Sequence, residues 1–124
     1  MTTILIVDDV EDTAESLAEL CEAMGHEAHV ARDGAQAVAL AAETTPLIVL
    51  LDLRMPDIDG FETARRLREA PGGSGMFIVA LTGISGPGIA RRTKAAGFDF
   101  HLTRPLDTNA LLTLIEDLSA RRRP

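Results

Sequence analysis

Short apolar runs alternate with longer segments of helical period along the whole chain. Three runs are almost wholly apolar, at residues 4–7, 47–51 and 76–81. Runs of this kind predict strands that are buried on both faces, as in a parallel sheet. Two further runs, at residues 29–31 and 98–102, mix apolar and polar residues, which is typical of strands at the edge of a sheet.

Segments of helical period follow each predicted strand. The recurring apolar residues are Ala14, Leu17, Ala18, Cys21 and Met24 in the first segment; Ala35, Val38, Ala39 and Ala42 in the second; Phe61, Ala64 and Leu67 in the third; and Leu111, Leu114, Ile115 and Leu118 in the last. Gly25 and Gly97 are suitable helix stops. Pro87 predicts the first turn of the fourth helix, and Asp107 predicts a cap on the fifth.

The alternation amounts to five strand–helix units, (βα)5. Such units with right-handed crossovers predict an α/β fold with a doubly wound, five-stranded parallel sheet. The three apolar strands belong in the centre and the two mixed strands at the edges, which gives the strand order 2-1-3-4-5. The Gly-rich loop at residues 71–75 is too short to be a linker, so residues 1–124 are expected to form one domain.

Composition and net charge argue against several classes of function and location. The formal net charge of −7 argues against direct nucleic-acid binding, which requires a basic surface. No apolar run is long enough to insert into a membrane, and the N-terminus lacks a signal peptide, so a cytoplasmic location is expected. Cys21, the single cysteine, lies on an apolar helix stripe and is expected to be a core residue.

Acidic residues close two of the apolar strands. Asp8 and Asp9 follow the first strand, and Asp52 follows the third. In the predicted strand order these strands are neighbours, so the three carboxylates meet in the crevice beyond their carboxyl ends. Clustered carboxylates without nearby Cys or His favour Mg²⁺ over zinc. One of Asp8 and Asp9 could also cap the helix that follows.

The same crevice receives the residues that end the fourth and fifth strands. Thr82 and Gly83 follow one strand, and Arg104 with Pro105 follows the other. A metal, a cation and a hydroxyl beside a carboxylate suit phosphoryl transfer, with the carboxylate as nucleophile.

These motifs together resemble the receiver domain of two-component response regulators, a flavodoxin-like α/β domain. The resemblance covers essentially all of the chain and rests on residues 4–9, 52–60, 80–83 and 97–106. Any one motif alone is weak, since an acidic pair after a strand is common. Four motifs in the right order and on the right elements form a specific pattern.

The resemblance implies a role for each residue in the crevice. Asp52 is the expected phosphoacceptor. Asp9 is an expected Mg²⁺ ligand, Asp8 a ligand through water or a supporting acid, and the backbone carbonyl of Arg54 a further ligand. Thr82 is expected to bond the phosphoryl group and to act as a switch. Gly83 leaves room for the phosphodonor.

Two positions depart from the usual pattern of the family. Arg104 stands where Lys is usual, and a planar guanidinium is not equivalent to a compact ammonium group. It is expected either to hold the phosphoryl group or to pair with Asp52 and lock the site. His101 stands at the switch position, which is usually Tyr or Phe, as in some receivers of hybrid histidine kinases. The resemblance further implies a cis bond between Arg104 and Pro105, and roles for Arg54 and Ile84 in tuning the phosphoryl lifetime.

Other polar residues have simpler interpretations. Asp57 and Asp59 are interpreted as turn residues before Gly60. His26 and His29 are expected on the surface or at an edge strand, without the spacing of a zinc site. The basic run at residues 121–123 is expected to be a solvated helix end.

The predicted function is that of a phosphorelay switch. A sensor histidine kinase or a histidine phosphotransfer protein donates the phosphoryl group to Asp52, and the face made by the fourth helix, fifth strand and fifth helix then binds a protein target. The chain is expected to lack an output domain, either as a free-standing protein or as one domain of a hybrid kinase. One alternative is a pseudo-receiver that acts only as a docking module. Another is a small Mg²⁺-dependent phosphatase, against which Arg54 counts because such enzymes place an acid there.

Overall fold

The predicted strands and helices alternate in the folded chain. The computed structural model describes residues 2–54, 59–83 and 86–121. In order, its elements are β1 (Thr3–Val7), α1 (Glu11–Ala23), β2 (Glu27–Ala31), α2 (Gly34–Thr44), β3 (Ile48–Asp52), α3 (Gly60–Glu69), a 3₁₀ turn η1 (Gly73–Gly75), β4 (Phe77–Thr82), α4 (Pro87–Ala96), β5 (Phe100–Thr103) and α5 (Thr108–Ala120).

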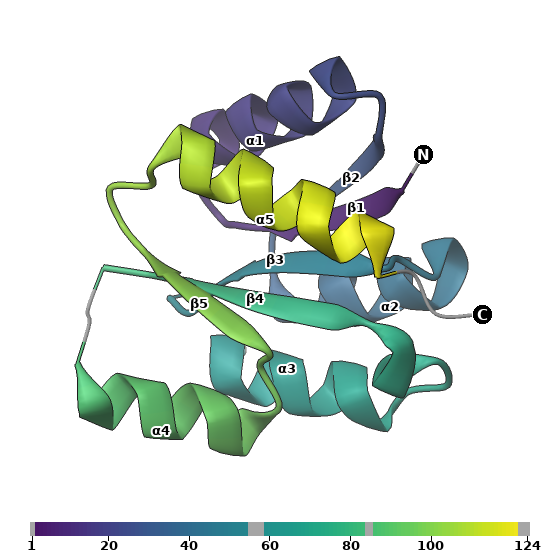
Figure 1. The fold of residues 1–124 in the computed structure, drawn as a ribbon. Helices are drawn as coiled ribbons and strands as arrows, with labels where there is room; N and C mark the ends of the chain where they lie inside the picture. Colours follow the sequence, from purple (N-terminus) through teal and green to yellow (C-terminus); the bar gives the residue numbers. More distant parts are fainter. Residues whose placement is uncertain (1, 55–58, 84–85, 122–124) are drawn as a thin grey trace.

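The sheet has the predicted topology. Its five strands are all parallel, and their order is β2-β1-β3-β4-β5. Helices α1 and α5 cover one face, and α2, α3 and α4 cover the other (Figure 1). Every residue of β3 and β4 is buried, whereas all four residues of β5 and four of the five residues of β2 are exposed or half-buried, which confirms the assignment of central and edge strands. The chain therefore has a flavodoxin-like α/β fold.

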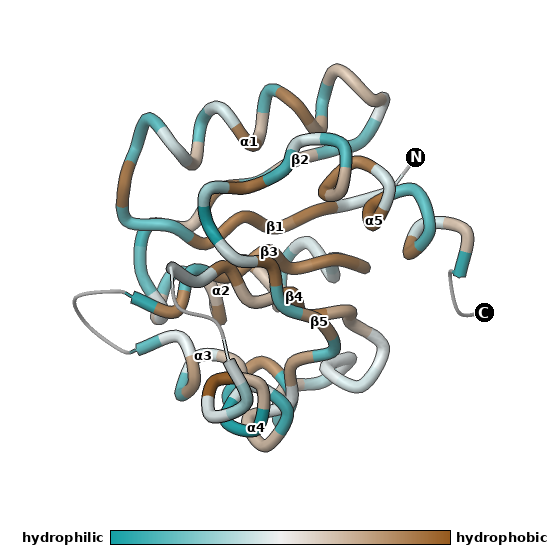
Figure 2. Tube along the Cα trace, turned by 60° about the vertical axis from the view of Figure 1, so that its left-hand side comes forward, coloured by the Kyte–Doolittle hydropathy of each residue, from teal (hydrophilic) through white to brown (hydrophobic). Residues whose placement is uncertain are grey.

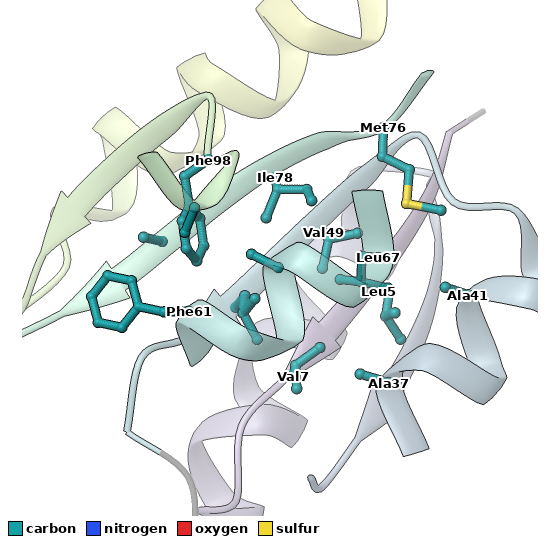
Figure 3. Packing of buried hydrophobic residues seen from close by; sticks show 14 of the residues in the cluster. Leu5, Val7, Ala37, Ala41, Val49, Phe61, Leu67, Met76, Ile78 and Phe98 are labelled. Carbon is teal, nitrogen blue, oxygen red and sulfur yellow. The ribbon is translucent and has the colours of Figure 1, made fainter. Parts of the chain in front are cut away.

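Two apolar layers, one on each side of the sheet, form the core. Figure 2 shows the central strands β1 and β3 largely in the hydrophobic colour, whereas hydrophobic and hydrophilic residues alternate along the surrounding helices. On the face covered by α2, α3 and α4, Leu5, Val49 and Ile78 pack against Leu67 of α3 (Figure 3). In the same layer the rings of Phe61 and Phe98 meet edge to face, with centroids 6.3 Å apart. Cys21 is fully buried in the other layer, as predicted, and burial raises the pKa of its thiol to about 11.

Most helix ends follow the local sequence signals. Gly25 and Gly97 have positive φ angles just after α1 and α4, and Asp107 caps α5 by accepting hydrogen bonds from the N–H groups of Asn109 and Ala110. Asp59 is more than a turn residue, because its carboxylate caps α3 through the Glu62 N–H. Helix boundaries were therefore predictable wherever a side chain or a glycine satisfies the terminal backbone groups.

The strand boundaries differ from those predicted by a residue or two. β5 begins at Phe100 and not at Phe98, because the Phe98 N–H bonds to the Thr93 carbonyl and closes α4. β2 begins earlier than predicted, at Glu27, which pairs with Thr3. β3 and β4 run through Asp52 and Thr82, so these two residues end their strands and do not merely follow them.

Candidate phosphoacceptor site

The register of the central strands brings the predicted acidic residues together. Val7, the last residue of β1, lies beside Leu51 of β3, so Asp8 and Asp52 are neighbours one position further along. One carboxylate oxygen from each of Asp8, Asp9 and Asp52 lies within 4.8 Å of the others. Asp8 is fully buried and Asp52 is 7% exposed, whereas Asp9 is exposed to solvent. The cluster is thus closed toward the core and open on one side.

Two backbone N–H groups hold the carboxylates in place. The Val10 N–H donates to Asp8 Oδ1 at 2.9 Å, and the Arg54 N–H donates to Asp52 Oδ1 at 2.9 Å. The prediction that Asp8 or Asp9 caps α1 is wrong. The cap position is Val10, without a side-chain hydrogen bond, because the carboxylate of Asp8 is committed to the turn before the helix.

The electrostatics of Asp52 are those of a buried acid among other acids. Burial raises the pKa of its carboxyl, and the neighbouring charges of Asp8 and Asp9 act in the same direction. The Arg54 N–H and the charge of Arg104 oppose the shift, and the net direction is upward. The ionised form is therefore disfavoured until a cation compensates it.

Close backbone packing positions the end of β3. Gly60, the first residue of α3, donates its N–H to the Leu53 carbonyl at 3.2 Å. A Cβ atom at this position would lie 2.6 Å from Leu53 Cα and 2.7 Å from the Asp52 carbonyl oxygen. Helix α3 can therefore approach the strand end that carries Asp52 only because residue 60 is glycine.

Arg104 enters the site, but it does not pair with Asp52. Its Nη2 donates to Asp8 Oδ2 at 3.0 Å, and its backbone N–H donates to the Thr82 carbonyl at 2.7 Å. The Arg104–Pro105 bond is cis, as the resemblance implied. Of the two alternatives for Arg104, the permanent pair with Asp52 is contradicted, because the guanidinium forms its ion pair with Asp8, the acid that follows β1.

The two predicted switch residues share one face of the sheet. Thr82 is buried at the end of β4. His101 lies beside Ala80 in the register of β4 and β5, and Ala80 is on the same side of β4 as Thr82. The side chain of His101 is exposed, and the residue lines a groove of about 430 Å³ with Lys94 of α4.

Arg32, directly after β2, is a neighbour of the site that the sequence did not indicate. Its Nη2 donates to the backbone carbonyl of Asp9 at 3.2 Å. Nothing in the local pattern distinguishes it from an ordinary surface arginine. Of the other predicted positions, Asp57, Ile84, Arg122 and Arg123 lie outside the described residues.

Comparison with known proteins identifies the family. Residues 4–116 match the response regulator receiver domain. The chain belongs to this family. It is 34% identical over 116 residues to the response regulator PleD of Caulobacter vibrioides, a match that covers 94% of this chain and 26% of PleD. The chain thus spans about a quarter of that relative's length.

Solved receiver structures have the same fold. The chemotaxis protein CheY4 of Vibrio cholerae superposes with a TM-score of 0.90 at 26% identity, covering 95% of this chain and 98% of CheY4. The signal receiver domain of a signal transduction histidine kinase from Syntrophus aciditrophicus gives 0.89 at 30% identity, covering 100% and 95%. A receiver domain is a signalling switch of a two-component system.

None of the helices within the described ranges combines the length and the hydropathy that crossing a bilayer requires.

Proposed function

We propose that this receiver domain accepts a phosphoryl group on Asp52 and thereby switches a protein-binding surface. The observation that carries the proposal is the cluster of Asp8, Asp9 and Asp52, whose carboxylate oxygens lie within 4.8 Å of one another at the ends of adjacent strands. Like charges at this separation, two of them buried, repel unless a cation joins them. Such an arrangement is expected at a functional site and is costly elsewhere.

The donor set fits Mg²⁺. All three side chains offer hard oxygen ligands, and the exposed Asp9 leaves a path from solvent. Asp8, Asp9, Asp52 and the backbone carbonyl of Arg54 are the proposed ligands, with Asp9 acting directly and Asp8 through water or as a supporting acid. When bound, the ion neutralises the negative charge of the transferring group. The residues themselves supply the nucleophile and its orientation.

The proposed donor is a phosphohistidine, on a histidine kinase or a histidine phosphotransfer protein. A carboxylate oxygen of Asp52 forms the new bond to phosphorus while the bond from phosphorus to the histidine nitrogen breaks, and the imidazole leaves with that electron pair. Asp52 Oδ1 already accepts the Arg54 N–H, so Oδ2 is the oxygen proposed to attack. The product is an acyl phosphate on Asp52.

Thr82, Arg104 and His101 are the proposed readout of phosphorylation. Thr82 lies at the end of the strand next to β3, where its hydroxyl can donate to a phosphoryl oxygen on Asp52. Arg104 adds a positive charge beside the same group, and Gly83 leaves the approach to Asp52 open. A shift of Thr82 toward the phosphoryl group vacates space on the face that it shares with His101. The change is thereby passed to the surface of α4, β5 and α5.

The exposed side of β5 suits protein binding. Phe100, Leu102 and Leu114 line a groove of about 870 Å³ between β5 and α5, and the acidic residues Asp99, Asp107 and Asp117 lie among its lining. His101 lines both this groove and the smaller one against α4. A downstream target with an apolar centre and basic flanks would fit this surface.

One observation favours the second candidate, a pseudo-receiver that docks partners without phosphorylation. The Arg104–Asp8 ion pair satisfies part of the acidic cluster without any metal. In that case Mg²⁺ with beryllofluoride, a mimic of the phosphoryl group, would leave the melting temperature unchanged. In a working receiver, Mg²⁺ and beryllofluoride bind the folded protein and thereby raise its melting temperature.

Intact-mass spectrometry tests the proposal. The protein is incubated with acetyl phosphate and Mg²⁺ beside two variants, Asp52→Ala and Asp117→Ala. Asp117 is a matched control because its exposed carboxylate pairs only with Arg121 among the described residues. We expect one phosphate adduct on the wild type and on Asp117→Ala, and none on Asp52→Ala. An adduct that persists in Asp52→Ala refutes the assignment of the phosphoacceptor, and no adduct on any folded variant supports the pseudo-receiver.

A further inference from the structure

Asp8 is the most enclosed member of the acidic cluster, and both of its oxygens are already bonded. Oδ1 accepts the Val10 N–H at 2.9 Å, and Oδ2 accepts Arg104 Nη2 at 3.0 Å. The side chain of Asp8 is fully buried, so bulk solvent compensates little of its charge. Arg104 is therefore the cation that balances Asp8 in this structure.

The contact spans much of the sheet. Asp8 follows β1 and Arg104 follows β5, and the strand order places β3 and β4 between them. The outer nitrogens of an arginine lie one bond further from Cα than the ammonium nitrogen of a lysine. The extra length therefore gives the guanidinium a longer reach toward Asp8 than a lysine at this position would have.

The guanidinium is only partly satisfied. Its Nε atom is buried and has no hydrogen-bond partner among the described residues. A buried N–H donor without an acceptor is destabilising. A hydrogen-bond acceptor placed near Nε would therefore stabilise Arg104. The ion pair with Asp8 uses one arm of the fork and leaves this donor without one.

We infer that Arg104 is a built-in counter-ion that competes with the divalent cation for Asp8. The inference rests on the proposed Mg²⁺ site. The guanidinium and a divalent cation repel each other at one buried carboxylate, so one must retreat for the other to bind. By linkage, whatever Arg104 contributes to the metal-free site is subtracted from the affinity for the metal.

The competition links the binding of the metal ion to the binding of the phosphoryl group, because both depend on the position of the Arg104 side chain. If a bound metal displaced Arg104 from Asp8, the Nη2 donor of Arg104 would become available together with its buried, unpartnered Nε. A planar pair of N–H donors matches two oxygens of a phosphoryl group, which a single ammonium nitrogen does not. Arg104 thus neutralises Asp8 in the metal-free site. Once displaced from Asp8, it donates hydrogen bonds to the phosphoryl group on Asp52.

Calorimetric titration with Mg²⁺ at fixed pH and ionic strength tests the inference. The variants are Arg104→Met, which removes the charge, and Arg104→Lys, which keeps it on a shorter chain. Arg91→Met is the matched control, because Arg91 is exposed on α4 and has no ion pair with any described residue. It removes the same charge from an exposed position on α4.

We expect Arg104→Met to bind Mg²⁺ about tenfold more tightly than the wild type, within the usual range for coupled sites. Arg104→Lys should lie between the two, and Arg91→Met should stay within about twofold of the wild type, since a surface charge is screened. If Arg104→Met does not fold, the comparison of Arg104→Lys with the wild type decides in the same way.

Equal or weaker Mg²⁺ binding by the Arg104 variants overturns the inference. If the wild type still forms the phosphate adduct in that case, the proposed function stands without the competition. If no variant binds Mg²⁺ and none forms the adduct, both proposals are wrong.

Discussion

Replacing Arg68 should destabilise the domain more than replacing any ordinary surface arginine. Arg68 lies near the end of α3, and its guanidinium donates to the carbonyls of Gly97, Gly73 and Met76 at 2.7–2.9 Å and to Asp99 Oδ2. Asp99 Oδ2 also accepts the Ile78 N–H at 2.8 Å. One side chain thus ties together the end of α3, the start of β4 and the turn before β5.

The size of the effect follows from these contacts. Each of the three hydrogen bonds to a carbonyl contributes about 1 kcal/mol to the free energy of unfolding. The ion pair with Asp99 is partly exposed, at 22% for Arg68 and 32% for Asp99, so it adds less than about 1 kcal/mol. We expect Arg68→Ala to lower the free energy of unfolding by ~3 kcal/mol. With an unfolding entropy of about 2.1 cal/mol/K per residue, this lowers the melting temperature of the 124-residue chain by roughly 12 °C.

Thermal and urea unfolding, followed by circular dichroism, measure the effect. Arg66→Ala is the matched control, because the exposed Arg66 lies on the same helix and pairs only with Glu62 among the described residues. Its loss should change stability by less than about 0.5 kcal/mol. Arg68→Lys should recover less than half of the loss, since one ammonium nitrogen cannot serve four acceptors placed around a fork. If the free energy of unfolding of Arg68→Ala lies within about 0.5 kcal/mol of that of Arg66→Ala, the hydrogen bonds of Arg68 do not stabilise the fold as proposed.

Two further predictions concern the site. A carboxyl whose pKa is raised on folding contributes stability that is present below its unfolded pKa and is lost as pH rises through the folded value. Asp52→Asn in EDTA should therefore unfold at a higher temperature than the wild type at pH 7, with the difference vanishing below pH 3.8, the ordinary value for Asp; a difference that is independent of pH would contradict this. Gly60→Ala should cost about 1–3 kcal/mol through the clash with Leu53 and Asp52 and slow adduct formation. Gly75→Ala, where a Cβ would meet nothing within 4 Å, is its control, and equal effects would show that the close approach is not limiting.

The local pattern of the sequence was enough to predict the architecture. Three runs lack polar alternation, which is typical of central strands that are buried on both faces of a parallel sheet. The mixed runs at residues 29–31 and 98–102 are typical of edge strands. These two assignments led to the predicted strand order 2-1-3-4-5. That order alone makes Asp8 and Asp52 neighbours. The acidic cluster was predictable for the same reason, because parallel strands deliver their carboxyl ends to one edge of the sheet.

The partners of the charged side chains were decided only by tertiary packing. A sequence states that Arg104 is a cation near several acids, but not which acid it reaches, because long side chains choose among acceptors by distances of a few ångströms. The same holds for Arg68, which looks like one of several arginines on α3 and binds three carbonyls from other segments. The sequence by itself therefore determined the elements, their order and the acids that meet. The folded chain decided which cation balances which acid, because that choice depends on burial and reach across strands that are distant in sequence.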